Sequence, residues 1–357
     1  MKRLFILPLL LLAVVSVSAQ LKYVDATTLT LIGKAKPTSQ PYHRIDTMIY
    51  KGFTKTENQQ VRCSAGLALV FKTNSKKIVV NPSYTNFVYT GVSTPRTSSE
   101  GFDLYIHKDG QWLYAASTAP KSRTKSFTLI ENMDNQEKEC LLYLPMYSEL
   151  KSLQIGVDES ASIEPMNNPF RHKILIFGSS FTHGVSTSRA GMSYPMQIER
   201  NTGLYFCSIA CSGNSKLQPY FADYIRDIDD ADAIVFDGFS NPDAKMIEER
   251  LVPFVKRIRE KLPTTPLIFV QTIYRESGNF DLRKRKIEED KIRTSNRLMK
   301  EIIKNDKNIY LIDSKNFTGT DHMTSADGTH PSDFGYWRWA CNLQPKLLKV
   351  LKKYDVK

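Results

Sequence analysis

The stretch KILIFGSSFTHG, residues 173–184, joins a short apolar run to a turn in which Ser180 lies between two glycines. Four more apolar runs follow, at residues 205–209, 233–236, 267–270 and 309–312. Stretches of helical composition separate these runs, including residues 242–261 and 281–304. Strands that alternate with helices predict an α/β domain whose parallel sheet is covered on both faces. In such a sheet the functional residues gather at the carboxyl ends of the strands.

The region before this domain has a different sequence pattern, with short β-rich runs and no convincing helix between them. The pairs of runs at 67–71 and 78–80, and at 102–106 and 112–114, flank turn residues and predict two hairpins. The second hairpin has the stronger signal, because its turn is Asp109-Gly110, a pair that tolerates positive φ. Further runs lie at 127–130, 140–144 and 153–157. This series predicts an antiparallel β-sandwich.

The first residues have the pattern of a secretory signal peptide. Lys2 and Arg3 precede an apolar run over residues 4–15, and the small residues of Val17-Ser18-Ala19 follow. We expect cleavage after Ala19 and a secreted or periplasmic protein, with an uncleaved N-terminal anchor as the alternative. No later apolar stretch has the roughly 20 residues that a membrane span needs. The expected organisation is a signal peptide (1–19), a β-sandwich domain (20–160), a polar linker (161–172) and an α/β domain (173–357).

Charge and cysteine content narrow the class of protein. The formal net charge is +12, or about +10 without Lys2 and Arg3, and the basic residues are scattered without a nucleic-acid motif. Such a balance permits acidic substrates, but solvated helix faces are the favoured interpretation. Of the five cysteines, Cys63 and Cys140 are the most plausible disulfide pair in an exported protein, and the odd count leaves a free, buried thiol. Cys207 and Cys211 lack the spacing of a zinc site. The function expected below needs neither a metal nor a cofactor.

Polar residues suited to acyl transfer follow the strands of the predicted parallel sheet. Ser180 follows the first strand, Gly213 the second and Asn241 the third, while Asp327 and His330 follow the last. Because His330 comes three residues after Asp327, one loop delivers a base and the carboxylate that orients it. Each feature alone also fits an ordinary turn or a helix cap. Their occurrence in this order at the strand ends of one sheet favours a nucleophilic site.

Several segments together resemble the SGNH/GDSL hydrolase superfamily, in particular a bacterial branch of two-domain GDSL-like lipases and acylhydrolases. The segments are GSSFTHG (178–184), RAGMSYP (189–195), SGNSKL (212–217) and DGTHPSDFGY (327–336), with GFDLY (101–105) in the first domain. The resemblance implies a three-layer α/β/α, flavodoxin-like hydrolase domain behind a G-x-D-L-Y type sandwich. Two departures occur. Ser179 replaces the usual acidic residue of the G-D-S-L block, and Asn241 lies one residue later than in the plain G-x-N-D pattern.

The resemblance also implies roles for the site residues. Ser180 is the expected nucleophile, His330 its base and Asp327 the carboxylate that holds the imidazole. The expected oxyanion donors are the backbone N–H groups of Ser180 and Gly213 and the side-chain amide of Asn241.

His183 and His322 are the alternative candidates for the base, and two tryptophans follow in the last predicted helix. His183 is expected to line the cleft and His322 to lie in a loop, while Trp337 and Trp339 are expected in the core rather than on a sugar-binding surface.

The expected function is hydrolysis of small acyl esters, with acetyl groups on carbohydrate favoured as the substrate and no nucleic acid as partner. The alternatives are a short-chain lipid esterase, an acyltransferase that uses the same site, and a non-catalytic glycan-binding protein.

Overall fold

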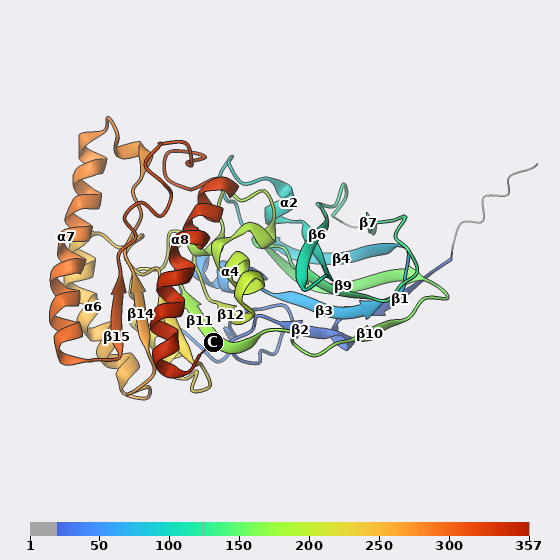
Figure 1. Cartoon of the computed structure of the whole chain (residues 1–357), viewed down its shortest axis with the longest axis horizontal. Helices are drawn as coiled ribbons and strands as arrows, with labels where there is room; N and C mark the ends of the chain where they lie inside the picture. Colours follow the sequence, from blue (N-terminus) through green and yellow to red (C-terminus); the bar gives the residue numbers. More distant parts are fainter. Residues whose placement is uncertain (1–19, 124, 357) are drawn as a thin grey trace, which may run out of the picture.

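The structure is a computed structural model that describes residues 20–123 and 125–356, so the expected signal peptide lies outside the described residues. Two antiparallel sheets come first in the chain, and one parallel sheet with helices on both faces follows (Figure 1). The predicted fold class, an all-β part followed by an α/β hydrolase fold, is therefore confirmed. Within the described ranges, no helix combines the length and the apolar character needed to cross a membrane.

The two antiparallel sheets have the strand orders β1-β9-β4-β7 and β10-β3-β8-β5-β6, and β2 also pairs with β3. The strands are β1 Leu21–Asp25, β2 Thr30–Ile32, β3 Ala68–Thr73, β4 Ile78–Phe87, β5 Phe102–Lys108, β6 Gln111–Thr118, β7 Phe127–Ile130, β8 Lys138–Tyr143, β9 Ser148–Asp158 and β10 Ile163–Pro165. Side chains from both sheets, such as Leu104, Leu142 and Ile155, share one buried core. A sandwich forms because alternate residues of each strand point into this core.

Two details of the sandwich differ from the sequence prediction. The hairpin predicted around Asn74-Ser75 is wrong, because β3 and β4 belong to different sheets and this turn leads from one sheet to the other. The hairpin at Asp109-Gly110 is confirmed, and both turn residues have positive φ. The short β10 falls inside the stretch expected to be a linker and pairs with β3.

The first domain also contains helices that the sequence prediction missed: α1 Lys55–Val61, α2 Arg96–Ser99 and the 3-10 turn η1 Ala26–Thr28. The signal for α1 was present as a capping box. The backbone N–H of Thr54 donates to Glu57 Oε2 at 2.7 Å, and Thr54 Oγ1 accepts from the Glu57 N–H at 3.4 Å.

The parallel sheet has the strand order β12-β11-β13-β14-β15, which places β12 and β13 on opposite sides of β11. Its strands are β11 Arg171–Phe177, β12 Leu204–Ser208, β13 Ala233–Phe236, β14 Leu267–Val270 and β15 Ile309–Ile312. The helices are α3 Ser180–His183, α4 Tyr194–Thr202, α5 Pro219–Arg226, α6 Ala244–Arg259, α7 Leu282–Asn305 and α8 Asp333–Leu351, with 3-10 turns η2 Ala190–Met192, η3 Glu276–Gly278 and η4 Lys352–Tyr354.

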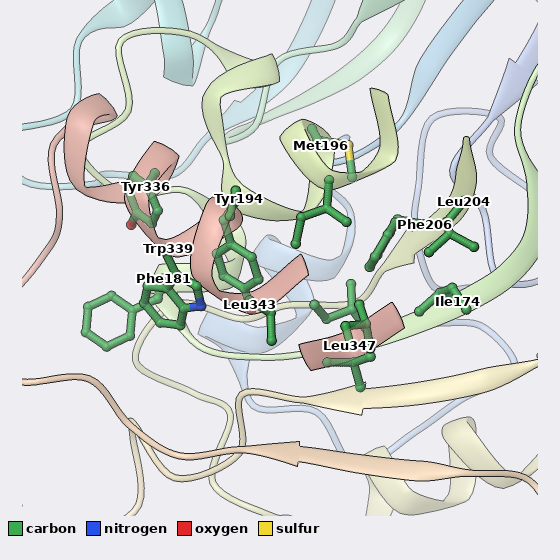
Figure 2. Packing of buried hydrophobic residues seen from close by; sticks show 14 of the residues in the cluster. Ile174, Phe181, Tyr194, Met196, Leu204, Phe206, Tyr336, Trp339, Leu343 and Leu347 are labelled. Carbon is green, nitrogen blue, oxygen red and sulfur yellow. The ribbon is translucent and has the colours of Figure 1, made fainter. Parts of the chain in front are cut away.

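Successive residues of β11 face opposite layers of helices, which explains why the strand is apolar throughout. Ile174 and Ile176 belong to the cluster that contains side chains of α4 and α8, while Leu175 and Phe177 belong to the cluster with α5 and α6. In the first cluster the ring of Tyr194 from α4 stacks on Trp339 from α8, with ring centroids 4.6 Å apart (Figure 2). This packing fixes both helices against the sheet.

The two domains are joined through the G-x-D-L-Y segment. The carboxylate of Asp103, buried in β5, accepts hydrogen bonds from the backbone N–H of Gly191 at 2.8 Å and from Arg189 Nε at 3.2 Å. Burial raises the pKa of Asp103 to about 6, although the charge of Arg189 and the Gly191 hydrogen bond oppose this shift. Two of the segments that carry the family resemblance therefore bind each other across the domain boundary.

The expected disulfide between Cys63 and Cys140 does not form, and all five cysteines are free thiols. Cys140 lies in the sandwich core on β8, whereas Cys63 follows α1 and its carbonyl accepts a hydrogen bond from Arg44 at 2.9 Å. The two residues thus belong to different parts of the first domain. Four of the five thiols are buried, and Cys341 is exposed.

Candidate active site

Ser180 lies at the point of the parallel sheet where the strand order reverses, which is where ligands bind in open α/β sheets. It is the first residue of α3, and Ser179 caps this turn by accepting a hydrogen bond from the Phe181 N–H at 3.1 Å. Glycine is needed at position 178, because a Cβ there would lie 2.1 Å from Thr182 Oγ1. The turn therefore presents the Ser180 side chain at the carboxyl edge of the sheet.

The structure brings the side chain of Ser180 together with those of His330 and Asp327, which lie about 150 residues later in the sequence. His330 Nε2 lies 2.9 Å from Ser180 Oγ, and His330 Nδ1 lies 2.8 Å from Asp327 Oδ2. In the neutral ring with its proton on Nδ1, His330 donates to Asp327 and accepts from the Ser180 hydroxyl. This is the arrangement of a nucleophile, a base and an orienting carboxylate.

Asp327 is held by its own loop. Its Oδ1 accepts hydrogen bonds from the backbone N–H groups of Thr329 at 2.9 Å and His330 at 2.7 Å. Partial burial acts to raise the pKa of Asp327, but these hydrogen bonds and that of the His330 ring outweigh it and keep the pKa below its ordinary value. The carboxylate is therefore charged and correctly placed over the neutral pH range.

The residues of the three expected oxyanion donors have polar groups that the rest of the described chain leaves without an acceptor. In the described parts of the chain, the backbone N–H groups of Ser180 and Gly213 have no acceptor. Asn241 Oδ1 accepts from the Ser215 N–H at 3.3 Å, which orients the amide, and the Asn241 nitrogen has no acceptor among the same residues. Gly213, which lines the pocket, has φ of +70° and open space where a Cβ would be. Ser180, Gly213 and Asn241 all line the same pocket.

Asp237 is a supporting residue to which the sequence analysis assigned no role. It is fully buried at the end of β13, and it accepts hydrogen bonds from the Ser179 N–H at 3.1 Å, from Thr182 Oγ1 at 3.1 Å and from Ser240 Oγ at 2.5 Å. Burial raises the pKa of Asp237, and these hydrogen bonds act against the rise. Asp237 ties the turn of Ser180 to the loop of Asn241. A carboxylate directly after an apolar strand was the available signal.

Residues of the first domain hold the loop that carries Gly213. The side chain of Gln60 in α1 donates to the Ser212 carbonyl at 2.9 Å, and the Tyr147 hydroxyl lies 2.6 Å from Ser212 Oγ. The fully buried Arg44 donates to the Ala210 carbonyl of the same loop at 2.9 Å. Sequence reasoning missed these residues because each contact joins positions more than 60 residues apart.

A pocket of about 470 Å³ surrounds the site, and both domains line it. Gln60, Tyr89 and Tyr147 belong to the first domain, and Ser180, Asn241 and His330 to the second. Its volume lies in the range of small-molecule sites.

The other histidines have different environments. His183 is fully buried, with Nε2 2.9 Å from the Met146 carbonyl and its ring stacked on Tyr147 at 4.0 Å between centroids. Burial, and then the charge of Arg44, hold its pKa well below the ordinary value. The expectation that His183 lines the cleft is wrong, because His183 is fully buried and the pocket is lined by Tyr147, on which its ring stacks. His322 is an exposed loop residue, as expected, 2.8 Å from a carboxylate oxygen of Glu276.

The expectation that both tryptophans of the last helix lie in the core is half right. Trp339 is completely buried, but Trp337 is 51% exposed and stacks on Phe334. Two positions along a helix correspond to a rotation of about 200°, so the two rings face opposite sides.

Residues 20–123 and 125–356 contain no cluster of three or more histidine, cysteine or carboxylate side chains arranged to hold a metal ion.

Family models match both parts of the chain. Residues 21–163 match the N-terminal region of SGNH-hydrolase-type esterases, and residues 171–348 match the GDSL-like lipase/acylhydrolase family. A solved structure of a candidate GDSL-like lipase from Bacteroides ovatus ATCC 8483 is 41% identical, covers 93% of this chain and 98% of its own, and superposes with a TM-score of 0.90. The chain belongs to the GDSL-like lipase/acylhydrolase family and is an ester hydrolase.

More distant structures share the fold. A salicylyl-acyltransferase from a tetracycline biosynthetic pathway is 20% identical, with a TM-score of 0.70 over 92% of this chain and 97% of its own. A family two carbohydrate esterase from Cellvibrio japonicus is 13% identical, with a TM-score of 0.62 over 93% of this chain and 98% of its own. No curated protein matches the sequence.

Proposed function

We propose that this esterase acts through an acyl-enzyme formed on Ser180. The single observation that carries the proposal is the continuous hydrogen-bonded chain from Ser180 Oγ through His330 to Asp327, with distances of 2.9 and 2.8 Å. Ser180 Oγ attacks the ester carbonyl carbon while His330 Nε2 takes its proton. His330 then gives this proton to the leaving alcohol oxygen as the C–O bond breaks.

Water completes the cycle. It attacks the acyl carbon while His330 takes one of its protons, and this proton returns to Ser180 Oγ as the carboxylic acid leaves. In both halves the negative charge on the carbonyl oxygen is met by the N–H groups of Ser180 and Gly213 and by the amide of Asn241. Such fixed donors stabilise the transition state more than the substrate, because the charge develops only there.

For the substrate we propose a small acyl ester on carbohydrate, with acetyl as the favoured acyl group. The pocket is open to a bulky alcohol and has the exposed aromatic ring of Tyr89 on its wall. The family two carbohydrate esterases have the same two-part fold, which is consistent with this choice. We also propose that residues 1–19 direct export and that cleavage follows Ala19, because of the basic start, apolar run and small residues there.

The test compares the wild type with Ser180→Ala and with Ser188→Ala as a matched control on a nearby exposed serine. We expect Ser180→Ala to lose hydrolysis of p-nitrophenyl acetate by a factor of at least about 10³, and Ser188→Ala to keep it. Acetate release from a panel of acetylated glycans then tests the substrate, and product analysis with acceptor sugars detects acyl transfer. Equal activity of Ser180→Ala and wild type would contradict the proposal.

A further inference from the structure

A second hollow of about 350 Å³ adjoins the pocket of Ser180. The two spaces share Arg275 and Thr329, and Thr329 immediately precedes His330. The walls of the second hollow come from the loop after β14 and from the N-terminal half of α7. Arg275 and Thr329 therefore lie where the two spaces meet.

The inner surface of the hollow is mainly apolar, with Ile273, Ile287 and Ile292 among its lining residues. The charged side chain that lines both spaces, Arg275, is already bound by the protein. Arg275 donates to the Ser240 carbonyl at 2.6 Å and lies 3.3 Å from the carboxylate of Glu288. Its charge is thus compensated, and the apolar surface is what the hollow offers to a ligand.

A second arginine at the hollow, Arg285, is also bound by the protein. The Arg285 guanidinium donates to the Gly278 carbonyl at 3.0 Å and to the Asn279 carbonyl, which leaves its hydrocarbon stem on the wall. Phe280, just before α7, and Leu282, the first residue of α7, are 95% and 69% accessible.

We propose that this hollow is a subsite for a hydrocarbon group attached to the scissile ester. The inference rests on the proposed function of Ser180, and it adds that one side of the ester carries an aliphatic chain or an aromatic ring of limited size. The group belongs either to the acyl part or to the alcohol part. If it belongs to the alcohol, the acetyl group favoured above stays in place; if it belongs to the acyl part, the acyl chain is longer than acetyl.

The test uses two series of esters. One keeps p-nitrophenol and lengthens the acyl chain from acetate to butanoate and hexanoate, and the other keeps acetate and changes the alcohol from methyl to butyl and benzyl. In one series we expect kcat/KM of the wild type to rise by up to about fourfold for each buried methylene until the hollow is full. Ile287→Trp fills the hollow from a half-exposed position, and Lys300→Trp places the same ring on the exposed far part of α7 as a control.

We expect Ile287→Trp to abolish the rise in that series while the shortest ester keeps its kcat/KM within about twofold, and Lys300→Trp to match the wild type. The subsite is ruled out if Ile287→Trp parallels the wild type in both series, or if it loses the shortest ester as much as the longest. Ser180-dependent hydrolysis without any length dependence removes the subsite alone. Absence of Ser180-dependent hydrolysis of every ester removes the proposed function and the subsite with it.

Discussion

The hydroxyl of Ser93, in the first domain, donates a hydrogen bond across the domain boundary to Asp327 Oδ2 at 3.2 Å. This oxygen is the one that also accepts from His330 Nδ1 at 2.8 Å. Ser93 Oγ lies in addition 2.7 Å from Ser186 Oγ, so its position is fixed from the second domain as well. The sandwich therefore helps to hold the carboxylate of the proposed triad, besides forming part of the pocket wall.

Ser93→Ala should lower kcat by about fivefold, because one hydrogen bond to a partly exposed carboxylate contributes on the order of 1 kcal/mol to its orientation. KM and the melting temperature should change little. Ser93→Thr keeps a hydroxyl and should restore most of the rate. Steady-state kinetics with p-nitrophenyl acetate and a thermal melt measure these effects. A wild-type kcat for Ser93→Ala, or an equal loss in Ser93→Thr, would show that the contact has no positioning role.

The parts of the fold that the sequence could predict are those set by local pattern. The strands of the parallel sheet are buried on both faces, so each is a short unbroken apolar run, and all five were found. The loop that carries Asp327 and His330 was also predictable, since three residues of spacing suffice to bring the carboxylate to the ring. The hairpin at Asp109-Gly110 was also predictable, because the residues of the turn itself favour it.

The parts that could not be predicted depend on contacts between distant segments. The turn at Asn74-Ser75 has hairpin composition, but β3 and β4 pair with other strands in two different sheets. Ser93 and Gln60 are ordinary polar residues in sequence, and only the docking of the two domains brings them to the site. The free thiols of Cys63 and Cys140 follow from the same cause, because their separation is decided by tertiary structure rather than by spacing.

Asn241→Ala should reduce kcat by a factor of about 10² to 10³, the usual effect of removing one oxyanion donor, while the protein stays folded. Asn241→Asp tests the donor role more specifically. It keeps an oxygen to accept from the Ser215 N–H but replaces the donating nitrogen with a second acceptor. We therefore expect a similar loss of kcat in Asn241→Asp with a melting temperature near that of the wild type. Full activity in either variant would exclude Asn241 from the oxyanion hole in spite of its free amide nitrogen.

Tyr89→Ala should weaken the binding of a carbohydrate ester more than that of a small one. The ring is 83% exposed on the pocket wall, and a tyrosine offers a large, rigid contact face at low entropic cost. We expect KM for an acetylated oligosaccharide to rise about fivefold, and the kinetics on p-nitrophenyl acetate to stay close to wild type. Val92→Ala, on the same loop and almost fully exposed but outside the pocket lining, is the control. Equal KM values for both variants on the oligosaccharide would refute a role for the ring.

Glu199→Gln should change how the stability of the protein depends on pH. Burial in α4 raises the pKa of Glu199 to about 8, although hydrogen bonds from the Phe206 N–H and the Tyr143 hydroxyl and the charge of Arg200 act to lower it. Between the ordinary value of 4.5 and about 8, the folded state holds a proton that the unfolded state has released. The free energy of unfolding must therefore fall as pH rises through this window, by up to about 1.4 kcal/mol per pH unit.

The glutamine side chain suits the site without titrating, since its oxygen can accept from Phe206 and its nitrogen can donate to the Tyr143 oxygen. We expect the stability of Glu199→Gln relative to wild type to increase steadily from pH 5.5 to 8.5 in urea unfolding experiments. Glu301→Gln, on an exposed part of α7, should show no such trend. Parallel stability curves for Glu199→Gln and wild type would mean that Glu199 is already ionised in the folded protein, with its charge balanced by Arg200.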